Sequence, residues 1–529
     1  MYTPESFSNP ERKILENYFT NIDQPVFVVM NLPEVVKGAL FARYSRSAKS
    51  LRRLFLDEFV NIDNGTLKNN KDFLVDLNRA EKLYDRVFSE YGDDSVAQLG
   101  GAHVACENAS NILTKVLEWG RLASYLEQST RYIFYDKKVN EQYRYVIPEE
   151  ISSDDLPDYK KNMDKLFNEY SLLVHKLVDF FKSKYPKSTN DSNFIYNSSI
   201  RAKACDVARG LLPASTFSNV GIFASGQAYE NMIMKMNSHP LAEVRSYSKL
   251  MLDELRKVIP SFLKRVDLPD RGLLWSKYFS DINQNMEKIV NDYGTDSSGN
   301  LEVDLIEWDH NAEDKIIVSA LYSYTNKSER ELIKIVEKLS QKEKERILFK
   351  YIGDRNNRRH KPGRAMERAY YRFDILSDFG SFRDLQRHRM MTIDWQKLST
   401  FNGFSVPEVI EEIKYKNTWE KIMIDMGEYF NILGSKYGLH VSQYVVPFSY
   451  NIRYSMQFNV REAYHLLELR TAPQGHVDYR RVCQKMHELI LNKAGHKILA
   501  NSMKYVDHNI YDLERIDAER AAEKRRTKK

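Results

Sequence analysis

The chain has 529 residues, of which 42% are hydrophobic, and a net charge of +6. This length and apolar content predict two or three domains with well-filled cores, and they argue against a disordered protein. The mild positive charge fits an anionic small-molecule ligand, and it fits weak nucleic-acid contact equally well.

Several classes of protein are excluded by what the sequence lacks. The three cysteines, Cys106, Cys205 and Cys483, are isolated, so they predict neither a disulfide framework nor a metal site. The polar first residues and the absence of an apolar run of about 18 residues predict no signal peptide and no membrane span. We therefore expect a cytoplasmic protein. Glycine-rich dinucleotide motifs and P-loops are also absent.

In the first half of the chain, hydrophobic periodicity and turn residues predict a series of helices separated by short polar segments. The predicted elements are a short helix in residues 1–20, a buried strand at 26–30, helical segments through 42–59, a turn at 91–96, a buried helix bearing Ile112, Leu113, Val116 and Leu117, helices on an insertion at 133–200, a helix at 225–235, an amphipathic helix at 243–264 and a linker at 293–300.

After this linker the pattern restarts. A strand is predicted at 303–306, the segment 318–324 resembles 41–45, and the helix that begins at Asn459 resembles the one that begins at Ser225. We therefore predict two copies of one domain with a period of about 230–280 residues, which is too long for a solenoid. The predicted boundaries are a first repeat at 1–275, a linker at 276–300, a second repeat at 301–515 and a basic tail at 516–529.

Residues 124–132 follow the buried helix and carry Glu127, Ser129 and Arg131 at alternate positions. Alternate residues of an extended segment point the same way, so these side chains would offer one ligand an acceptor, a small donor and a planar phosphate-binding fork. A polar loop that caps the preceding helix is the alternative interpretation.

A triplet of cationic and polar residues, Arg387, His388 and Arg389, ends a predicted helix in the second half. Arginine forks bind phosphate groups through two hydrogen bonds, so the triplet is a candidate site for an anionic ligand. The alternative is a solvated helix end, where the helix dipole favours positive charge.

A later predicted helix carries Asn459, Arg461, His465 and Arg470. Arg461, His465 and Glu468 lie on one face, at positions i, i+4 and i+7, and the opposite face is apolar. This polar face would either line a pocket or form ordinary surface.

The segment 124–132 reads Ser-Tyr-Leu-Glu-Gln-Ser-Thr-Arg-Tyr. It resembles the second half of the signature of flavin-dependent thymidylate synthases, Arg-His-Arg-x-x-Ser-x-Asn-Glu-x-Ser-x-Arg-Tyr. The first half is missing upstream, where Trp-Gly-Arg occupies 119–121 and Leu126 replaces the Asn. Arg-His-Arg occurs instead at 387–389, without the Glu, Ser and Arg after it. The two halves of one signature are therefore separated into the two repeats.

Further motifs show the same division. Asn459 and Arg461 resemble the family's Asn-x-Arg, which contacts flavin, and Arg470 resembles its later arginine over the pyrimidine; the first repeat has lost these cations. Arg209 lies in an Ala-Arg-x-x-Leu-Pro motif that resembles the family's nucleotide-binding segment, and Gln443 replaces this arginine in the second repeat.

The family's His-x-Thr/Ser-x-x-Glu-His motif, which binds flavin, is altered in both repeats. It corresponds to residues 93–99 in the first repeat and to 360–367 in the second. His360 and Glu367 are candidates for flavin contact, and a surface role is the alternative for both.

The resemblance implies an α+β fold, made of two tandem copies of a twisted antiparallel sheet flanked by helices. Because the family forms homotetramers with active sites between subunits, we expect a homodimer that contains four repeats. The implied reaction is reductive methylation of dUMP to dTMP, with FAD as cofactor and NADPH and methylenetetrahydrofolate (a folate) as co-substrates. The implied residue roles are catalysis by Arg470, substrate binding by Glu127, Gln128, Ser129, Thr130, Arg131, Arg209, Arg387 and Arg470, and cofactor binding by Arg387, His388, Arg389, Asn459, Arg461 and His465.

Some alternatives stay open at this point. The chain could be a related flavoenzyme that modifies another uridylate, or a catalytically inactive nucleotide- or RNA-binding protein, and the flavin could be FAD or FMN. The reciprocal loss of motifs places Arg131 and Arg387 around one nucleotide. We favour their coming from opposite chains of the dimer, although the linker is long enough for either arrangement.

Overall fold

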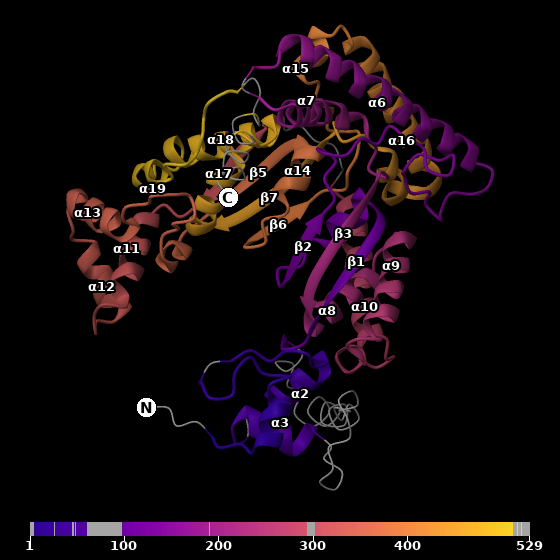
Figure 1. The fold of residues 1–529 in the computed structure, drawn as a ribbon. Helices are drawn as coiled ribbons and strands as arrows, with labels where there is room; N and C mark the ends of the chain where they lie inside the picture. The colour runs from indigo at the N-terminus through magenta and orange to yellow at the C-terminus, as the bar shows by residue number, and fades with distance from the viewer. Residues whose placement is uncertain are drawn as a thin grey trace. The chain divides into compact units, whose positions relative to one another are not determined.

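The computed structural model describes residues 5–25, 27–44, 47, 49–60, 98–189, 191–293, 302–511, 516 and 520. The protein belongs to the α+β class, and its described residues form two β-sheets, one in each half of the chain (Figure 1). In this described part of the chain, no helix is both long enough and apolar enough to cross a membrane. The turn predicted at 91–96 and the linker residues 294–300 lie outside the described residues.

The sheet of the first half has the strand order β1-β3-β2. Its strands are β1 (Gly101–Ser110), β2 (Ala123–Glu127) and β3 (Phe217–Ser225), and β2 pairs antiparallel with β3. Helix α8 (Gly226–Asn237) packs on this sheet, since the Tyr229 hydroxyl donates to backbone oxygens of β1 and β3.

The sheet of the second half has the order β4-β5-β7-β6, and each neighbouring pair is antiparallel. Its strands are β4 (Val303–Trp308), β5 (Tyr370–Asp378), β6 (Met391–Trp395) and β7 (Asn451–Asn459). The strand predicted at 303–306 is therefore confirmed. Burial alternates along β7, as expected for a strand with one face on a core.

The other elements are helical. In the first half they are α1 (Asn9–Leu15), α2 (Glu34–Tyr44), α3 (Leu51–Phe59), α5 (Asn111–Leu117), α6 (Leu156–Lys184), α7 (Asn193–Ala208), η2 (Arg209–Leu211), α9 (Ala242–Leu255), η3 (Pro260–Leu263) and α10 (Gly272–Asn291). In the second half they are α11 (Ala312–Tyr322), α12 (Glu329–Val336), α13 (Gln341–Ile352), η4 (Arg364–Arg368), α14 (Phe379–Leu385), α15 (Glu408–Glu412), α16 (Lys416–Ser442), η5 (Gln443–Val445), α17 (Val460–Arg470), α18 (Val477–Asn492) and α19 (Lys497–Ser502).

The two halves repeat the same sequence of elements. The segment β1-α5-β2 corresponds to β5-α14-β6 at a constant offset of 268 residues (379 − 111 and 391 − 123). The segment η2-β3-α8 corresponds to η5-β7-α17 at an offset of 234 (443 − 209 and 451 − 217). The strand orders β1-β3-β2 and β5-β7-β6 are also equivalent. The predicted internal repeat therefore has a counterpart in the topology.

The strand–helix junctions show why the repeat is visible in sequence. Ser110, Ser225, Asp378 and Asn459 are the N-caps of α5, α8, α14 and α17, and each side chain accepts a backbone N–H hydrogen bond. Short polar caps of this kind satisfy a backbone donor that would otherwise lack a partner at the start of a helix. Each half thus keeps the same local signal at equivalent positions.

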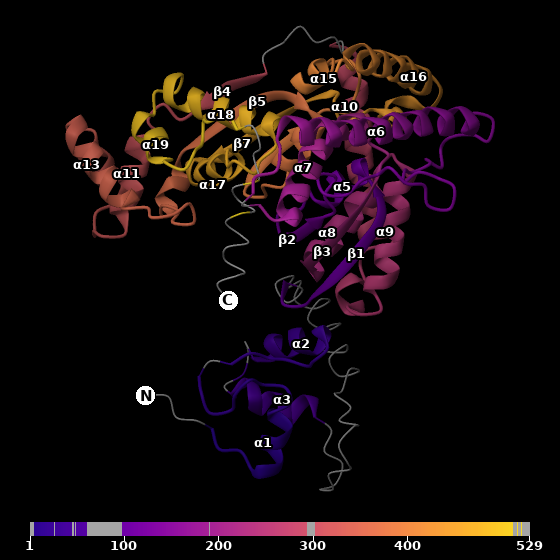
Figure 2. The ribbon, with the colours of Figure 1, turned by 45° about the horizontal axis from the view of Figure 1, so that its top comes forward.

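Helix α6 of the first half packs on helix α16 of the second half. Helices α6 and α16 lie side by side (Figures 1 and 2), and ion pairs join Lys165 to Asp425 and Asp155 to Lys436 at 2.6 Å each. The two Leu-Pro segments also meet, because Ser215 donates its backbone N–H to the Tyr444 carbonyl.

The chain forms two compact units. The first comprises Met1–Glu107, Leu122–Glu127 and Asn219–Thr295, and the second comprises Asn108–Arg121, Gln128–Ser218 and Asp296–Lys529. Helices α5, α6 and α7 therefore belong to the same unit as the second half. The compact units do not follow the predicted repeat boundaries, because packing joins parts of both repeats.

The N-terminal predictions need correction. Residues 27–30 form no strand beyond one bridge between Phe19 and Val29, and Val28 is 63% exposed, so the apolar run is not a buried strand; Val26 lies outside the described residues. The helical pattern through 42–59 is interrupted between α2 and α3, where Ser50 caps the start of α3.

Two later predictions also differ from the structure. Helix α9 ends at Leu255, and the non-helical Ile259 and the proline after it, Pro260, are incompatible with a continuous helix at 243–264. The predicted linker at 276–300 begins inside α10, which continues to Asn291. Within the predicted tail at 516–529, Arg520 donates to both carboxylate oxygens of Asp191, and residues 521–529 lie outside the described residues.

The close approach of the two halves at Gly210 yields a stability test. A Cβ atom at Gly210 would lie 2.2 Å from Ser449 Oγ and 2.6 Å from the Trp419 ring. We expect Gly210→Ala to lower the free energy of unfolding by about 1–3 kcal/mol, because the buried ring cannot move away freely. Gly221→Ala is the matched control, since its Cβ would meet only one atom, at 3.9 Å. Equal denaturation midpoints for the two variants would contradict this account of the contact.

Candidate active site

The Arg-His-Arg triplet lies where helix α14 ends. Residues 386–389 lead from the last residue of α14 into β6, so the prediction that the triplet ends a helix is confirmed. His388 is buried, Arg387 is half-buried and Arg389 is exposed. The three side chains therefore have different surroundings, and His388 lies in the interior.

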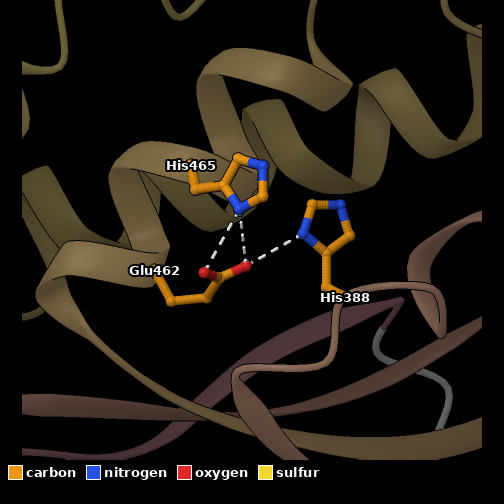
Figure 3. Close-up of side chains that lie close together, drawn as sticks. All are labelled: His388, Glu462 and His465. Atoms are coloured by element: carbon orange, nitrogen blue, oxygen red, sulfur yellow. Dashed lines mark hydrogen bonds and ion pairs between the residues drawn. The ribbon is translucent and has the colours of Figure 1, made fainter. Parts of the chain in front are cut away.

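His388, Glu462 and His465 form a hydrogen-bonded chain (Figure 3). Glu462 Oε1 lies 2.9 Å from His388 Nδ1 and 3.2 Å from His465 Nδ1. Burial disfavours the charge on Glu462, but the hydrogen bonds from both histidines outweigh it and lower the pKa of this carboxyl to about 2. Burial lowers the pKa of His388 to about 4, so His388 is neutral near pH 7.

Arg470, the last residue of α17, fixes the tautomer of His388. Its Nε donates to His388 Nε2 at 2.9 Å. Because a guanidinium has donors only, Nε2 carries no proton, and Nδ1 donates to Glu462. Arg470 Nη1 lies 3.5 Å from Asp384 Oδ1, and its guanidinium carbon lies 5.5 Å from the centre of the Tyr479 ring.

Arg131 comes from the first repeat and contacts the same tyrosine. Its Nε and Nη2 donate to the two carboxylate oxygens of Asp206 at 2.5 and 2.6 Å, and its Nη1 donates to the Tyr479 hydroxyl at 3.2 Å. Burial alone would lower the pKa of Arg131, but Asp206 outweighs it and holds this pKa well above its usual range. Tyr479 thus contacts arginines of both repeats.

Arg209 is the second arginine from the first repeat. It is 3% exposed, and its Nη1 lies 3.8 Å from Asp384 Oδ2. Its Nη2 is buried and has no hydrogen-bond partner among the described residues. Burial lowers the pKa of Arg209. The guanidinium is therefore held in the interior with one donor group left for an acceptor.

Asp384 is the counter-ion that these arginines share. Burial would raise the pKa of its carboxyl, but the charges of Arg470, Arg387, Arg209 and Arg131 outweigh burial and hold the pKa far below its usual range. All five residues belong to the second compact unit. They form what we call the arginine cluster: Arg131, Arg209, Arg387 and Arg470 with Asp384.

The arginine cluster forms within one chain. Arg209 of the first repeat and Arg470 of the second both approach the same carboxylate of Asp384. The expectation that the two repeats meet between opposite chains is therefore wrong for these residues. The close packing of α6 on α16 accounts for it, because it holds the first-repeat helices against the second repeat.

The segment that carries Glu127 and Arg131 is not extended throughout. β2 ends at the buried Glu127, and after Ser129 the chain turns, with Ser129 Oγ accepting the backbone N–H of Arg131 at 3.2 Å. The expected alternation of side chains therefore fails beyond Ser129. The buried Thr130 accepts a hydrogen bond from Arg383 at 3.3 Å, so its side chain is not free surface, and the backbone carbonyl of Gln128 accepts one from Ser218.

The candidate flavin residues lie near the start of α17. Asn459 caps this helix by accepting the N–H of Glu462 at 2.9 Å. Arg461 donates to the Pro362 carbonyl at 3.0 Å and to Glu367 at 3.4 Å. The structure therefore brings Arg461 and Glu367 together, as two of the candidate flavin motifs require.

His360 and Glu468 have other surroundings. His360 is exposed, and its ring nitrogen Nε2 lies 2.9 Å from the Asn357 amide. Glu468 is 1% exposed and accepts two hydrogen bonds from Arg355 at 2.6 Å each. The predicted polar face of Arg461, His465 and Glu468 is therefore not continuous, because Glu468 belongs to a buried ion pair.

Sequence reasoning missed four residues of the site: Asp206, Asp384, Glu462 and Tyr479. Two of them carried a local signal. Asp384 lies three residues before Arg387, a spacing that brings two side chains close together in a helical turn. Glu462 lies three residues after the cap Asn459, in the first turn of a helix, where an acidic side chain is favoured. Asp206 and Tyr479 had none, because their contacts join segments far apart in the chain.

His388, Glu462 and His465 also offer three atoms within 4.8 Å of one another, a spacing compatible with a metal ion. Both ring nitrogens of His388 are already engaged, with Glu462 and with Arg470. The positive charge of Arg470 beside His388 also opposes a cation there. Hydrogen bonding therefore accounts for this group without a metal.

Comparison with known proteins places these features in a family. The family described as thymidylate synthase complementing protein matches residues 39–261 and 304–494, one segment in each half. The UPF0159 protein of Chlamydia muridarum is 36% identical over 97% of this chain and 98% of its own length. The UPF0159 protein of Thermoplasma acidophilum is 32% identical, over 91% and 97% of the two chains.

More distant similarities cover one part of the chain at a time. A flavin-dependent thymidylate synthase of Clostridium tetani is 27% identical over 33% of this chain and 66% of its own length. Thymidylate synthase X from Helicobacter pylori, solved with FAD and dUMP, covers 39% of this chain and 100% of its own at 15% identity and a TM-score of 0.29. The UMP/dUMP methylase PolB from Streptomyces cacaoi covers 39% and 96% at 16% identity and a TM-score of 0.29.

The two segments matched by the family comprise 223 and 191 of the 529 residues, and they contain the equivalent strands and helices of the two halves. The chain therefore belongs to the family of thymidylate synthase complementing proteins, with the family's domain present twice.

Proposed function

We propose that this chain is a cytoplasmic flavin-dependent thymidylate synthase, which converts dUMP to dTMP with methylenetetrahydrofolate as carbon donor and NADPH as hydride source. Family membership and the similarity to the Clostridium tetani enzyme support this class of reaction. The observation that carries the proposal is the arginine cluster, in which arginines of both repeats lie around one carboxylate.

The charge of the arginine cluster favours an anionic ligand. Its four arginines outnumber the carboxylates that lie against them in the described ion pairs, those of Asp206 and Asp384, so positive charge is in excess. A third carboxyl nearby, that of Asp378, has its pKa raised by burial and by Asp478, so it is less able to neutralise this excess. A phosphate monoester carries nearly two negative charges at neutral pH and fits this excess.

Arg209 supplies the clearest sign of a missing acceptor. A buried donor without a partner costs free energy, and native proteins rarely keep one. The unpartnered Nη2 of Arg209 is therefore placed to donate to an oxygen of the nucleotide. Gly380 lies beside it, and a Cβ there would be 3.4 Å from this nitrogen, so glycine keeps the approach open.

Arg470 is our choice for the catalytic residue. The C5 atom of a pyrimidine is a weak nucleophile, and a guanidinium over the ring would stabilise the negative charge that develops on N3 and O4. His388 orients Arg470 by accepting from Nε, and Glu462 holds His388 in the tautomer that allows this. Loss of one such donor typically costs about 10²–10³ in rate.

The residues near the start of α17 fit a flavin with phosphate groups. Arg461 is half-buried, and burial, with smaller contributions from the charges of Arg461 and Arg358, lowers the pKa of Lys361, so these three cations lie near one another. Arg387, His388, Arg389, Asn459, Arg461 and His465 would hold FAD in this proposal. When bound, FAD supplies hydride transfer, and the protein positions it against the nucleotide.

A related enzyme acting on another uridylate is the second candidate. Leu126 stands where the family has Asn, and its side chain is 80% exposed, so one polar contact of the family's motif is absent. Assaying dUMP and UMP side by side separates the two candidates by the methylated product. A nucleic-acid-binding role is less well supported, because the arginine cluster is largely buried whereas such surfaces need exposed cations.

Neutral His388 makes the stability depend on pH. The native pKa is about 4 and the ordinary value is 6.5, so the unfolded chain binds the proton first. Stability is therefore complete above pH 6.5 and falls by up to about 3 kcal/mol as the pH drops toward 4. We expect His388→Asn to flatten this slope in urea-unfolding midpoints, and His175→Gln, at an exposed histidine, to leave it intact. If stability depends on pH equally steeply in both variants, His388 is not the buried neutral group that causes this dependence.

Nucleotide binding should depend on Arg209. We expect Arg209→Gln, which introduces the residue found at the equivalent position 443, to weaken dUMP binding about 10- to 150-fold, since one charge-assisted hydrogen bond contributes about 1.5–3 kcal/mol. Arg201→Gln, on an exposed position of α7, is the control. Calorimetric titration measures both, and equal affinities would remove Arg209 from the site.

Flavin binding should depend on Arg461. We expect Arg461→Gln to reduce the flavin retained per chain about tenfold or more, because a half-buried cation near the cofactor phosphates is lost. Arg364→Gln is the matched control, since Arg364 also pairs with Glu367 but is 85% exposed. The visible absorption spectrum of each purified variant is the readout. Unchanged flavin in Arg461→Gln would refute this placement of the cofactor.

A further inference from the structure

Helix α10 (Figure 1) joins the two repeats in the sequence, and it carries an apolar stripe in which most of the side chains are exposed. Its residues lie outside both segments matched by the family, 39–261 and 304–494. The apolar stripe therefore does not belong to the family's domain, because the segment matched in each half of the chain does not include α10. We call this set of residues the α10 seam: Trp275, Phe279, Ile282, Met286, Ile289 and the following Tyr293.

The α10 seam has the spacing of a coiled coil. Successive members are separated by four, three, four, three and four residues, which are the steps between the a and d positions of heptads. Ile282, Met286 and Ile289 are 40%, 52% and 46% exposed, so large apolar side chains in the middle of the seam lie in solvent. The spacing reads the same in both directions, so a second copy of the seam would match it in either orientation.

The residues beside the α10 seam are compatible with a second copy of the same seam as the partner. The flanking e and g positions within the helix, Ser276, Tyr278, Asn283, Asn285 and Val290, carry no charge, and Asp292, the g position before Tyr293, is a single charged residue just after the helix. Two copies brought together would therefore meet no like-charge repulsion at the flanking positions within the helix.

The charged residues of α10 lie away from the seam. Lys277, Asp281, Glu287 and Lys288 all occupy the outer b, c and f positions, and their charges cancel. A helix that lies on an anionic membrane has an excess of lysine and arginine on its polar face, which α10 lacks. This charge pattern favours a protein partner over a membrane surface.

One edge of α10 is already fixed to its own unit. Ser276 is 8% exposed and donates to the Met234 carbonyl of α8 at 3.0 Å. Gly272, one turn before Ser276, is buried as well. This anchoring holds the helix while its seam stays exposed, so a partner would bind a preformed surface rather than a segment that has to fold first.

We propose that α10 pairs with α10 of a second copy of this chain, through the α10 seam, and that this contact holds two chains together. The pairing buries on each helix an apolar surface that the single chain leaves in water. It also assigns a role to residues 276–291, which the sequence suggested were only a linker. The inference does not depend on the reaction proposed above.

A matched pair of charge substitutions tests the proposal. Ile282→Glu places a carboxylate in the middle of the seam, whereas Gln284→Glu adds the same charge at an outer position. Light scattering should give twice the 62.1 kDa chain mass for the parent and for Gln284→Glu, and a dimer weakened on the order of 100-fold or more for Ile282→Glu. A parent that is monomeric, or an Ile282→Glu variant that dimerises normally, overturns the proposal.

Cross-linking gives a second readout that does not require a damaged interface. The natural cysteines Cys106, Cys205 and Cys483 are buried, so a cysteine added at position 282 would be the reactive one. A short bismaleimide should link Ile282→Cys chains into dimers and leave Gln284→Cys chains largely unlinked. If Ile282→Cys is protected from reaction yet stays uncross-linked, the seam is covered by the chain itself or by another molecule, and the proposal fails.

Discussion

The carboxylate of Asp384 is the point on which the two repeats depend. Arg209 of the first repeat and Arg470 of the second approach its two oxygens, and four arginines together hold it ionised in the interior. Removing one partner from a buried ionic group is strongly destabilising, at about 3–5 kcal/mol, because the remaining charge is left without compensation. The arginines of one repeat therefore need the carboxylate of the other, and neither repeat holds the complete group.

The positions equivalent to the arginine cluster in the opposite repeats have lost both the carboxylate and the arginines. At the constant offsets between the halves, Val116 stands where the second repeat has Asp384, Gly120 where it has His388, and Met236 where it has Arg470. Gln443 likewise replaces Arg209. Once an apolar residue replaces the shared carboxylate, arginines around it would be buried without a compensating negative charge. Loss of the carboxylate together with the arginines is therefore physically consistent. One site is kept and the other has lost its charges as a set.

Local patterns predicted much of the fold, and distant contacts could not be predicted. The caps Ser225 and Asn459, the helix end before Arg387 and the repeat itself were readable, because each depends on residues within a few positions. The bidentate pair of Arg131 with Asp206 and the meeting of Arg131 and Arg470 at Tyr479 arise only after α7 and α18 pack together.

The errors have physical causes of the same kind. The apolar residues 26–30 resemble a strand, but sequence periodicity does not reveal whether another element covers them. The turn after Ser129 depends on one side-chain hydrogen bond that an alternating pattern hides. The linker predicted at 276–300 overlaps helix α10, although the apolar residues of the α10 seam have helical spacing.

The central claim is that both repeats of a single chain build one nucleotide site. It is tested most directly by mixing two defective chains, Arg209→Gln and Arg470→Ala, unfolded and refolded together, and counting dUMP sites and turnover in the mixture. If the site lies within one chain, every chain keeps its own defect, and the mixture does no better than the separate variants. Wild-type chains refolded with the double variant serve as the positive control. Recovery of part of the wild-type activity by the mixture would show that the halves come from different chains, and it would contradict this account.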